Sequence, residues 1–135
     1  MARGPLSLVE KIAQRCVVKG RPGPREFVQI RPHKCMTHDN SAAVIEKFES
    51  LGVVDIHAPD QLVFTLDHNV QDRSERNLAK YQRIAAFARA HGIDAYGAGR
   101  GIGHQVMVEE GHVLPGTMVV ASDSHSNMYG GLGCL

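Results

Sequence analysis

The sequence has no tryptophan, only three cysteines and almost no excess of charge of either sign. Its 15 Lys and Arg residues against 14 Asp and Glu give a formal net charge of +1, which excludes the basic field typical of nucleic-acid-binding proteins. The cysteines, at 16, 35 and 134, form no Cys-x-x-Cys pair, and this favours a reducing, intracellular compartment. No apolar run approaches the roughly 20 residues that span a bilayer. We therefore expect a soluble protein that takes neither nucleic acid nor a membrane as its partner.

Helical and strand-like patterns alternate along the chain. Helical spacing of apolar residues predicts helices at 6–18, with Ser7 as N-cap, at 40–51, ending at Gly52, and near 105–110. The most regular helix runs to Gly92, and the spacing from Asp72 to Glu75 predicts a capping box at its start. Short β-rich runs predict strands at 53–56, 62–66, 93–96 and 117–121, while prolines and glycines predict a loop at 20–24. This alternation indicates a layered α/β fold with a mixed or parallel sheet flanked by helices.

The length and the C-terminal composition bear on domain organisation. A chain of 135 residues with 43% hydrophobic residues suffices for one core, and we expect a single domain over 1–135. The sequence stops at Leu135 within a stretch containing Gly130, Gly131 and Gly133, which resembles the approach to a helix. We expect the chain to be the N-terminal piece of a longer protein.

The histidines are the most informative polar residues. Of the eight, His38, His68, His104 and His125 follow or flank short loops, and two are preceded by an aspartate within two positions, in Asp67-His68 and Asp123-Ser124-His125. Both pairs come just past the ends of predicted strands, where α/β sheets bind their ligands. A neighbouring carboxylate fixes the imidazole tautomer and favours its charged form. The pattern predicts a site of proton transfer, the alternative being surface or capping pairs.

Other motifs are incomplete. The glycine segment 97–103 gives no GxGxxG in any register, because Ile102 and His104 occupy the third glycine position. It is either a flexible loop or an anion-binding loop assisted by Arg100. Ser124 lacks the GxSxG context of a hydrolase nucleophile, and the histidine spacing matches neither HExxH nor a zinc finger.

Three segments resemble the N-terminal part of the aconitase superfamily: TLDH at 65–68, GRGIGHQ at 99–105 and, above all, ASDSHSNMYGG at 121–131. The resemblance covers nearly the whole chain, 8–135. The Asp-Ser-His motif is common to aconitases, isopropylmalate dehydratases and homoaconitases, whereas MTHDN at 36–40 and SNMY at 126–129 point to the homoaconitase branch.

The resemblance implies an aconitase-type α/β/α domain, part of a large hydro-lyase built around a [4Fe-4S] cluster. A homoaconitase interconverts cis-homoaconitate and homoisocitrate in lysine biosynthesis, and one iron of the cluster polarises the departing hydroxyl. The family's cluster cysteines belong to a Cys-Thr-Asn segment and a Cys-x-x-Cys pair, and neither occurs here. We therefore expect no metal ligand in this segment and no activity from it alone. Cys134 is expected to be a small buried hydrophobe.

The resemblance also assigns roles to individual residues. Asp67 and His68 would protonate the leaving hydroxyl, His104 and His125 would line the cluster and substrate, and Asp123 would orient His125 or the iron-bound water.

Three further residues would bind substrate. Ser124 would contact a carboxylate, His38 would stand where relatives carry a substrate-contacting residue, and Arg100 would assist the glycine loop.

The resemblance further implies the partners: a small tricarboxylate substrate, and the rest of the same polypeptide or a small-subunit swivelling domain. Isopropylmalate dehydratase large subunit and aconitate hydratase remain alternatives within the class, and a truncated, non-catalytic binding module is an alternative outside it. Fungal relatives are mitochondrial, whereas a bacterial source would imply the cytoplasm.

Overall fold

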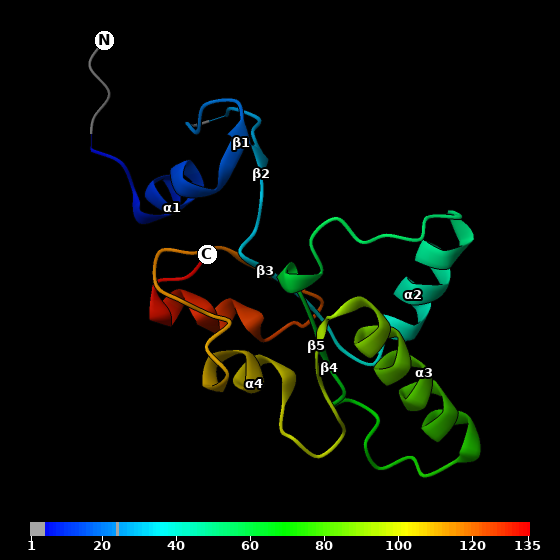
Figure 1. Ribbon diagram of the computed structural model, residues 1–135. Coiled ribbons are helices and arrows are strands. Elements are labelled where there is room, and N and C mark those ends of the chain that lie inside the picture. The colour runs from blue at the N-terminus through cyan, green and yellow to red at the C-terminus, as the bar shows by residue number, and fades with distance from the viewer. Residues whose placement is uncertain (1–4, 24) are drawn as a thin grey trace.

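A four-stranded parallel sheet forms the centre of the molecule (Figure 1). The computed structural model describes residues 5–23 and 25–135. The strands are β3 (Lys34–Thr37), β4 (Leu62–Thr65), β5 (Asp94–Tyr96) and β6 (Val119–Ala121), and their order is β5-β4-β3-β6. Met36 pairs with Val63 on one side and with Ala121 on the other. All four carboxyl ends therefore meet at one edge of the sheet.

Helices cover both faces of this sheet. Helices α2 (Ser41–Ser50) and α3 (Glu75–His91) lie on one face, and α4 (Gly103–Glu109) and the 3₁₀ helix η2 (Ser126–Leu132) lie on the other (Figure 1). Adjacent residues of β4 alternate between the two cores, because side chains along a strand point to opposite faces. Val63 packs with Met107 of α4, whereas Phe64 packs with Ile84 of α3. The predicted α/β/α layering is confirmed.

The chain reverses direction across the sheet after β5. The path from β3 through β4 to β5 moves outward in one direction, with α2 and α3 as crossovers, and β6 then returns to the opposite side of β3. Right-handed crossovers require the helices of the two directions to lie on opposite faces. The change of direction falls between β3 and β6, and α/β sheets bind ligands beyond the carboxyl ends of the strands near such a point.

An N-terminal unit stands beside the sheet. Helix α1 (Leu8–Cys16) begins at the predicted N-cap, where Ser7 and Glu10 form a capping box. The predicted helix extended to 18, but the chain turns at Val17 into β1 (Val17–Lys19), which pairs antiparallel with β2 (Gln29–Ile30). Pro24, the last residue of the predicted loop at 20–24, lies outside the described residues.

The strand predictions differ from the structure at 53–56 and at β3. The predicted strand at 53–56 is wrong, since this segment is irregular and Val54 is 77% exposed. β-Branched residues form a strand only where a neighbouring strand pairs with them, and 53–56 pairs with none of the described strands. Strand β3 itself was not predicted, because Lys34–Thr37 contains one β-branched residue and no clear alternation.

Helix boundaries differ by smaller amounts. Helix α3 begins after Ser74, whose side chain accepts the Asn77 N–H, so the predicted start at Asp72 is wrong. Asp72 instead accepts the N–H of Ser74. Gly92, with a φ of 67°, ends this helix as predicted. The remaining short helix, η1 (Pro59–Gln61), precedes β4. None of the described helices is long and apolar enough to cross a bilayer.

Candidate active site

Polar residues from four loops converge at the carboxyl edge of the sheet. His38 follows β3, the Asp67-His68 pair follows β4, and His104 lies in the first turn of α4, beyond β5. Asp123 and His125 follow β6. The parallel register brings these strand ends together, although the loops are far apart in the sequence. Ser122 Oγ, for example, lies 3.3 Å from Asn40 Oδ1, and 82 positions separate the two residues.

Asp67 and His68 form the tightest pair of this edge. His68 Nδ1 lies 2.6 Å from Asp67 Oδ1, and the aspartate side chain is 4% exposed whereas that of the histidine is 48% exposed. The hydrogen bond with Asp67 raises the pKa of His68; burial opposes the rise, and the charges of Asp67, Asp39 and Asp123 add to it. Because Nδ1 is engaged by the carboxylate, Nε2 is the nitrogen that can exchange a proton with a ligand.

Gly103 allows α4 to begin directly against Asp67. Its N–H donates to Asp67 Oδ2. A Cβ at this position would lie 2.5 Å from Thr65 Oγ1 and 3.0 Å from Asp67 Oδ2, so no larger residue fits without displacing them. The glycine segment therefore serves a close backbone approach at this residue.

Asp123 is the second buried carboxylate, with its side chain 4% exposed. Its Oδ1 accepts the His125 N–H at 2.9 Å and lies 3.3 Å from His104 Nδ1, while Oδ2 is 3.9 Å from His125 Nδ1. Burial raises the pKa of Asp123, but the His125 N–H, the nearby histidines and the Ser126 hydroxyl together lower it below its ordinary value. A permanent negative charge thus stands between two imidazoles.

The histidines pack as two ring pairs. His38 stacks on His68 with centroids 4.0 Å apart and planes 20° apart, and His104 lies 5.4 Å from His125. A cavity of about 350 Å³ separates the two groups. The cavity is lined by two aspartates, three histidines and one apolar residue: Asp67, Asp123, His68, His104, His125 and Ile102.

All three predicted substrate-binding residues, His38, Ser124 and Arg100, lie outside that lining. Ser124 is exposed next to His125, with its Oγ 3.5 Å from His125 Nδ1. Arg100 is bound by Glu109, at 2.9 Å from its Nη1, and by Glu110. The structure does not bring the Arg100 guanidinium to the histidines.

The sequence reasoning missed two polar residues that hold the site. Asp39 and Asn77 are both buried, and each makes hydrogen bonds to the loop that carries Asp67 and His68. Asp39 could have been identified from the sequence, since it adjoins His38 in the MTHDN segment. Asn77 carried no signal, because polar residues within a helix are mostly exposed.

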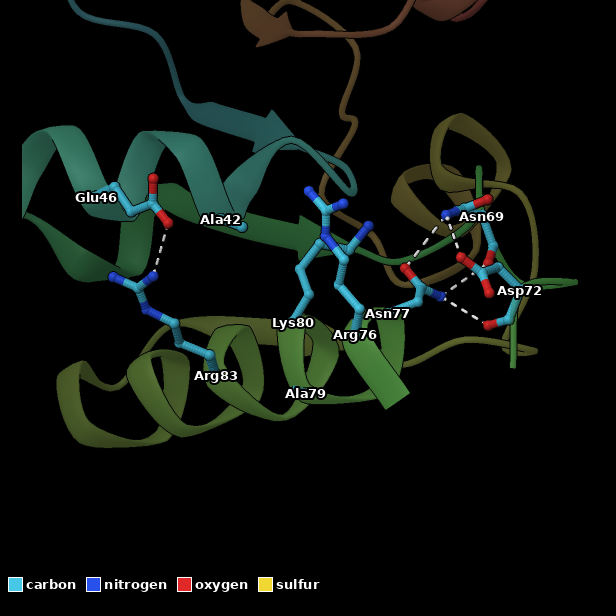
Figure 2. Close-up of a pocket in the computed structure, with 9 residues that line it drawn as sticks. All are labelled: Ala42, Glu46, Asn69, Asp72, Arg76, Asn77, Ala79, Lys80 and Arg83. Atoms are coloured by element: carbon cyan, nitrogen blue, oxygen red, sulfur yellow. Dashed lines mark hydrogen bonds and ion pairs between the residues drawn. The ribbon is translucent and has the colours of Figure 1, made fainter. Parts of the chain in front are cut away.

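A larger cavity lies elsewhere. A groove of about 580 Å³ runs between α2 and α3, and Figure 2 shows that charged and amide side chains line it. Arg83 pairs there with Glu46 at 2.8 Å, and Asn77 bonds to Asn69 at 3.3 Å. No histidine is among its lining residues. We therefore assign the candidate active site to the smaller cavity.

Histidine nitrogens and aspartate oxygens at the carboxyl edge of the sheet are potential metal ligands. His104, Asp123 and His125 offer ligand atoms within 4.8 Å of one another, as do the residues around Asp67 and His68. Iron–sulfur clusters, however, are held by cysteine thiolates. The three cysteines lie in α1, in β3 and after η2, apart from both groups. Cys134 is buried in the core, as predicted. The described residues therefore do not fit as ligands of such a cluster.

Comparison with known proteins agrees with this picture of a parallel α/β domain. The model of the aconitase family (aconitate hydratase) matches residues 6–135. The chain belongs to the aconitase family.

Within this family, the chain is similar to curated homoaconitases. The chain is 59% identical over 138 residues to "Homoaconitase, mitochondrial" of Mycosarcoma maydis, which covers 99% of the chain and 19% of the relative. It is 58% identical to the protein of that name from Neurospora crassa, over 97% of the chain and 17% of the relative. The Cryptococcus neoformans protein is 56% identical, over 97% and 18%. The chain thus spans about a fifth of the length of these relatives.

Proposed function

We propose that this chain is the N-terminal domain of a hydro-lyase of the homoaconitase type, which interconverts homoisocitrate and cis-homoaconitate in lysine biosynthesis. The observation that carries the proposal is the Asp67–His68 pair at the carboxyl edge of the sheet, facing Asp123 across a cavity of about 350 Å³. The family and the homoaconitase relatives support the reaction class.

His68 acts as the general acid of the dehydration. Its Nε2–H is directed away from Asp67 and donates its proton to the substrate hydroxyl as the C–O bond breaks, so that water leaves. The C–H proton of the neighbouring carbon would pass to a base from another part of the enzyme, and the electron pair of that bond forms the alkene. Asp67 holds the ring in the tautomer with Nδ1 protonated, and its charge favours the imidazolium. In the hydration direction, the neutral ring takes the proton back from water.

The opposite group contributes to binding of the tricarboxylate. His104 and His125 line the cavity and carry ring N–H donors for a carboxylate, while the ionised Asp123 orients them. Ser124, next to His125, and His38, which stacks on His68, are proposed to complete the contacts. The alternative role of Arg100 at the glycine loop would require it to leave Glu109 and Glu110.

The remaining components are proposed to come from outside these residues. A [4Fe-4S] cluster, held by cysteines of another part of the enzyme, would supply Lewis-acid chemistry at the substrate hydroxyl. The rest of the same polypeptide, or a swivelling-domain subunit, would close the open side of the cavity. The mitochondrial names of the relatives favour the mitochondrial matrix as the compartment.

The test uses the full-length protein, purified without oxygen and assayed for iron, labile sulfide and hydration of three alkenes. We expect turnover of cis-homoaconitate well above that of cis-aconitate and of the isopropylmalate alkene, and rescue of a lysine but not a leucine auxotroph. Rescue of the leucine auxotroph alone would replace the proposal with an isopropylmalate dehydratase. A protein without iron, sulfide or turnover would be a binding module.

A further inference from the structure

Asp39 binds three consecutive main-chain N–H groups of the loop that carries the Asp67–His68 pair. Its Oδ2 accepts from the N–H of Asp67 at 3.0 Å and of His68 at 2.8 Å, and its Oδ1 accepts from that of Asn69 at 3.3 Å. The carboxylate follows β3 whereas its donors follow β4, so the contact joins the ends of two adjacent strands. Its side chain is 8% exposed.

Helix α3 holds this carboxylate from the other side. The Tyr81 hydroxyl donates to Asp39 Oδ1, and Lys80 Nζ lies 3.9 Å from the same oxygen. Burial raises the pKa of Asp39, but the Tyr81 hydroxyl and the three N–H groups outweigh burial and lower it. Asp39 is therefore an ionised acceptor whose two oxygens are both fully used.

The loop is also fixed at its far end. Asn77 of α3 donates to the carbonyl oxygens of Asn69, at 3.1 Å, and of Asp72, at 2.9 Å (Figure 2). Between these two anchors the main chain of 67–69 has little freedom to move. The Asp67 carboxylate can then meet both the Gly103 N–H and the His68 ring.

The geometry points to Asp39 as a positioning residue that fixes the main chain of 67–69 and, through it, the His68 ring, with Tyr81 holding the Asp39 carboxylate in place. As regards catalysis, this inference rests on the proposed role of His68 in the hydro-lyase. Asp39 itself does not line the cavity, and its side chain is satisfied by the loop and α3, so its effect on the reaction passes through His68.

The first test is Asp39→Asn in the full-length holoenzyme. The amide keeps the shape but presents NH₂ where one oxygen accepted, so at least one N–H of the loop loses its partner. Because a misplacement of about 1 Å costs on the order of 10²-fold in rate, we expect kcat to fall about 10- to 100-fold, with KM within about threefold. Asp94→Asn, which removes an exposed carboxylate 3.7 Å from Lys34, is the matched control and should leave both constants unchanged.

The second test separates positioning from general stabilisation. In a His68→Ala background, Asp39→Asn should lower kcat by less than about twofold, because the group that it positions is already gone. An equal loss of kcat in both backgrounds would overturn the inference.

The third test does not depend on activity. Hydrogen exchange of the peptide that contains 67–69 should become faster in Asp39→Asn than in Asp94→Asn. Should Asp39→Asn fail to fold, Tyr81→Phe carries the test, with faster exchange of the same peptide and a kcat loss of about three- to tenfold. Unchanged exchange in the folded variants would reject the positioning role. Faster exchange in a protein that hydrates none of the three alkenes would instead reject the proposed function and leave the positioning of the loop supported.

Discussion

The cavity at the strand ends and the groove between α2 and α3 differ in the state of their charged groups. The groove is larger, about 580 Å³ against 350 Å³, but the ion pair between its lining residues Arg83 and Glu46 joins two exposed side chains. The carboxylates of the smaller cavity are almost fully buried, and each stands against an imidazole. Size alone would not have singled out the cavity with the buried carboxylates.

The physical reason is the position of each region in the fold. The groove lies between the exposed sides of two helices, whose long side chains are free to pair with each other and with water. The cavity lies where four parallel strands end, so rigid backbone fixes short polar side chains at a place where water is partly excluded. Only the second arrangement shifts a histidine pKa in the direction that acid catalysis requires.

Removal of the acid should break the function of the strand-end cavity most strongly. In the full-length enzyme, His68→Ala should lower kcat by roughly 10²- to 10⁴-fold, the range typical of a lost general acid. Steady-state kinetics measures this, with His57→Ala, an exposed histidine outside the cavity, as the control. Turnover within a factor of two of the parent enzyme, at full iron content, would refute the assignment.

Removal of the supporting charge should have a smaller and pH-dependent effect. Asp67 raises the pKa of His68, so the parent ring keeps its proton to higher pH, and the dehydration rate declines as the pH rises through that raised pKa. In Asp67→Asn this decline should move to lower pH, and kcat should fall about 10- to 100-fold.

The pH profile of kcat for the dehydration measures this shift of the alkaline decline. The control is Asp60→Asn, at an exposed position. The losses from Asp67→Asn and His68→Ala should not be additive, because both act on one proton transfer. An alkaline limb that stays in place would mean that Asp67 does not support the imidazolium.

A single methyl group at Gly103 should disturb the cavity indirectly. The added Cβ of Gly103→Ala meets Thr65 Oγ1 and Asp67 Oδ2, and overpacking of this kind costs about 1–3 kcal/mol of folding stability. We expect a lower Tm and a kcat reduced by about tenfold, since Asp67 shifts. Gly97→Ala, in the same loop but with open space around its Cβ, should change neither. Equal effects of the two substitutions would show that only the flexibility of the loop matters.

The groove should tolerate change. Arg83→Ala removes the pairs with Glu46 and Glu49, which are exposed to solvent and contribute little. We expect kcat and KM to stay within a factor of two. A clear loss of activity in this variant would mean that the groove takes part in function and would erase the distinction between the two regions.

Local pattern predicted much of this molecule. Helical spacing and capping residues located α1, α2, α3 and α4 to within a few residues, and strand-like runs located β4, β5 and β6. The Asp-His spacing likewise singled out Asp67-His68 and Asp123-Ser124-His125 before their geometry was known. These signals are contained in short stretches, because hydrogen bonding and side-chain periodicity within an element involve near neighbours.

Other features depended on contacts between distant segments. Strand β3 has too weak a pattern to be recognised, yet it is the strand at which the chain changes direction across the sheet. The run at 53–56 has the composition of a strand but pairs with none of the described strands, and it stays irregular. The helix is capped by Ser74 and not by the predicted Asp72, because the Asp72 carboxylate accepts the Ser74 N–H.

The sequence by itself determined the alternation of helices and strands, the family resemblance and the two Asp-His pairs. The tertiary structure alone decided that these pairs face one cavity, that Arg100 is held away from it by Glu109 and Glu110, and that Asp39 binds the loop of His68. The reason is that strand order and the packing of loops are set by the burial of both faces of one sheet. That burial is a property of the whole domain, which no short stretch of sequence contains.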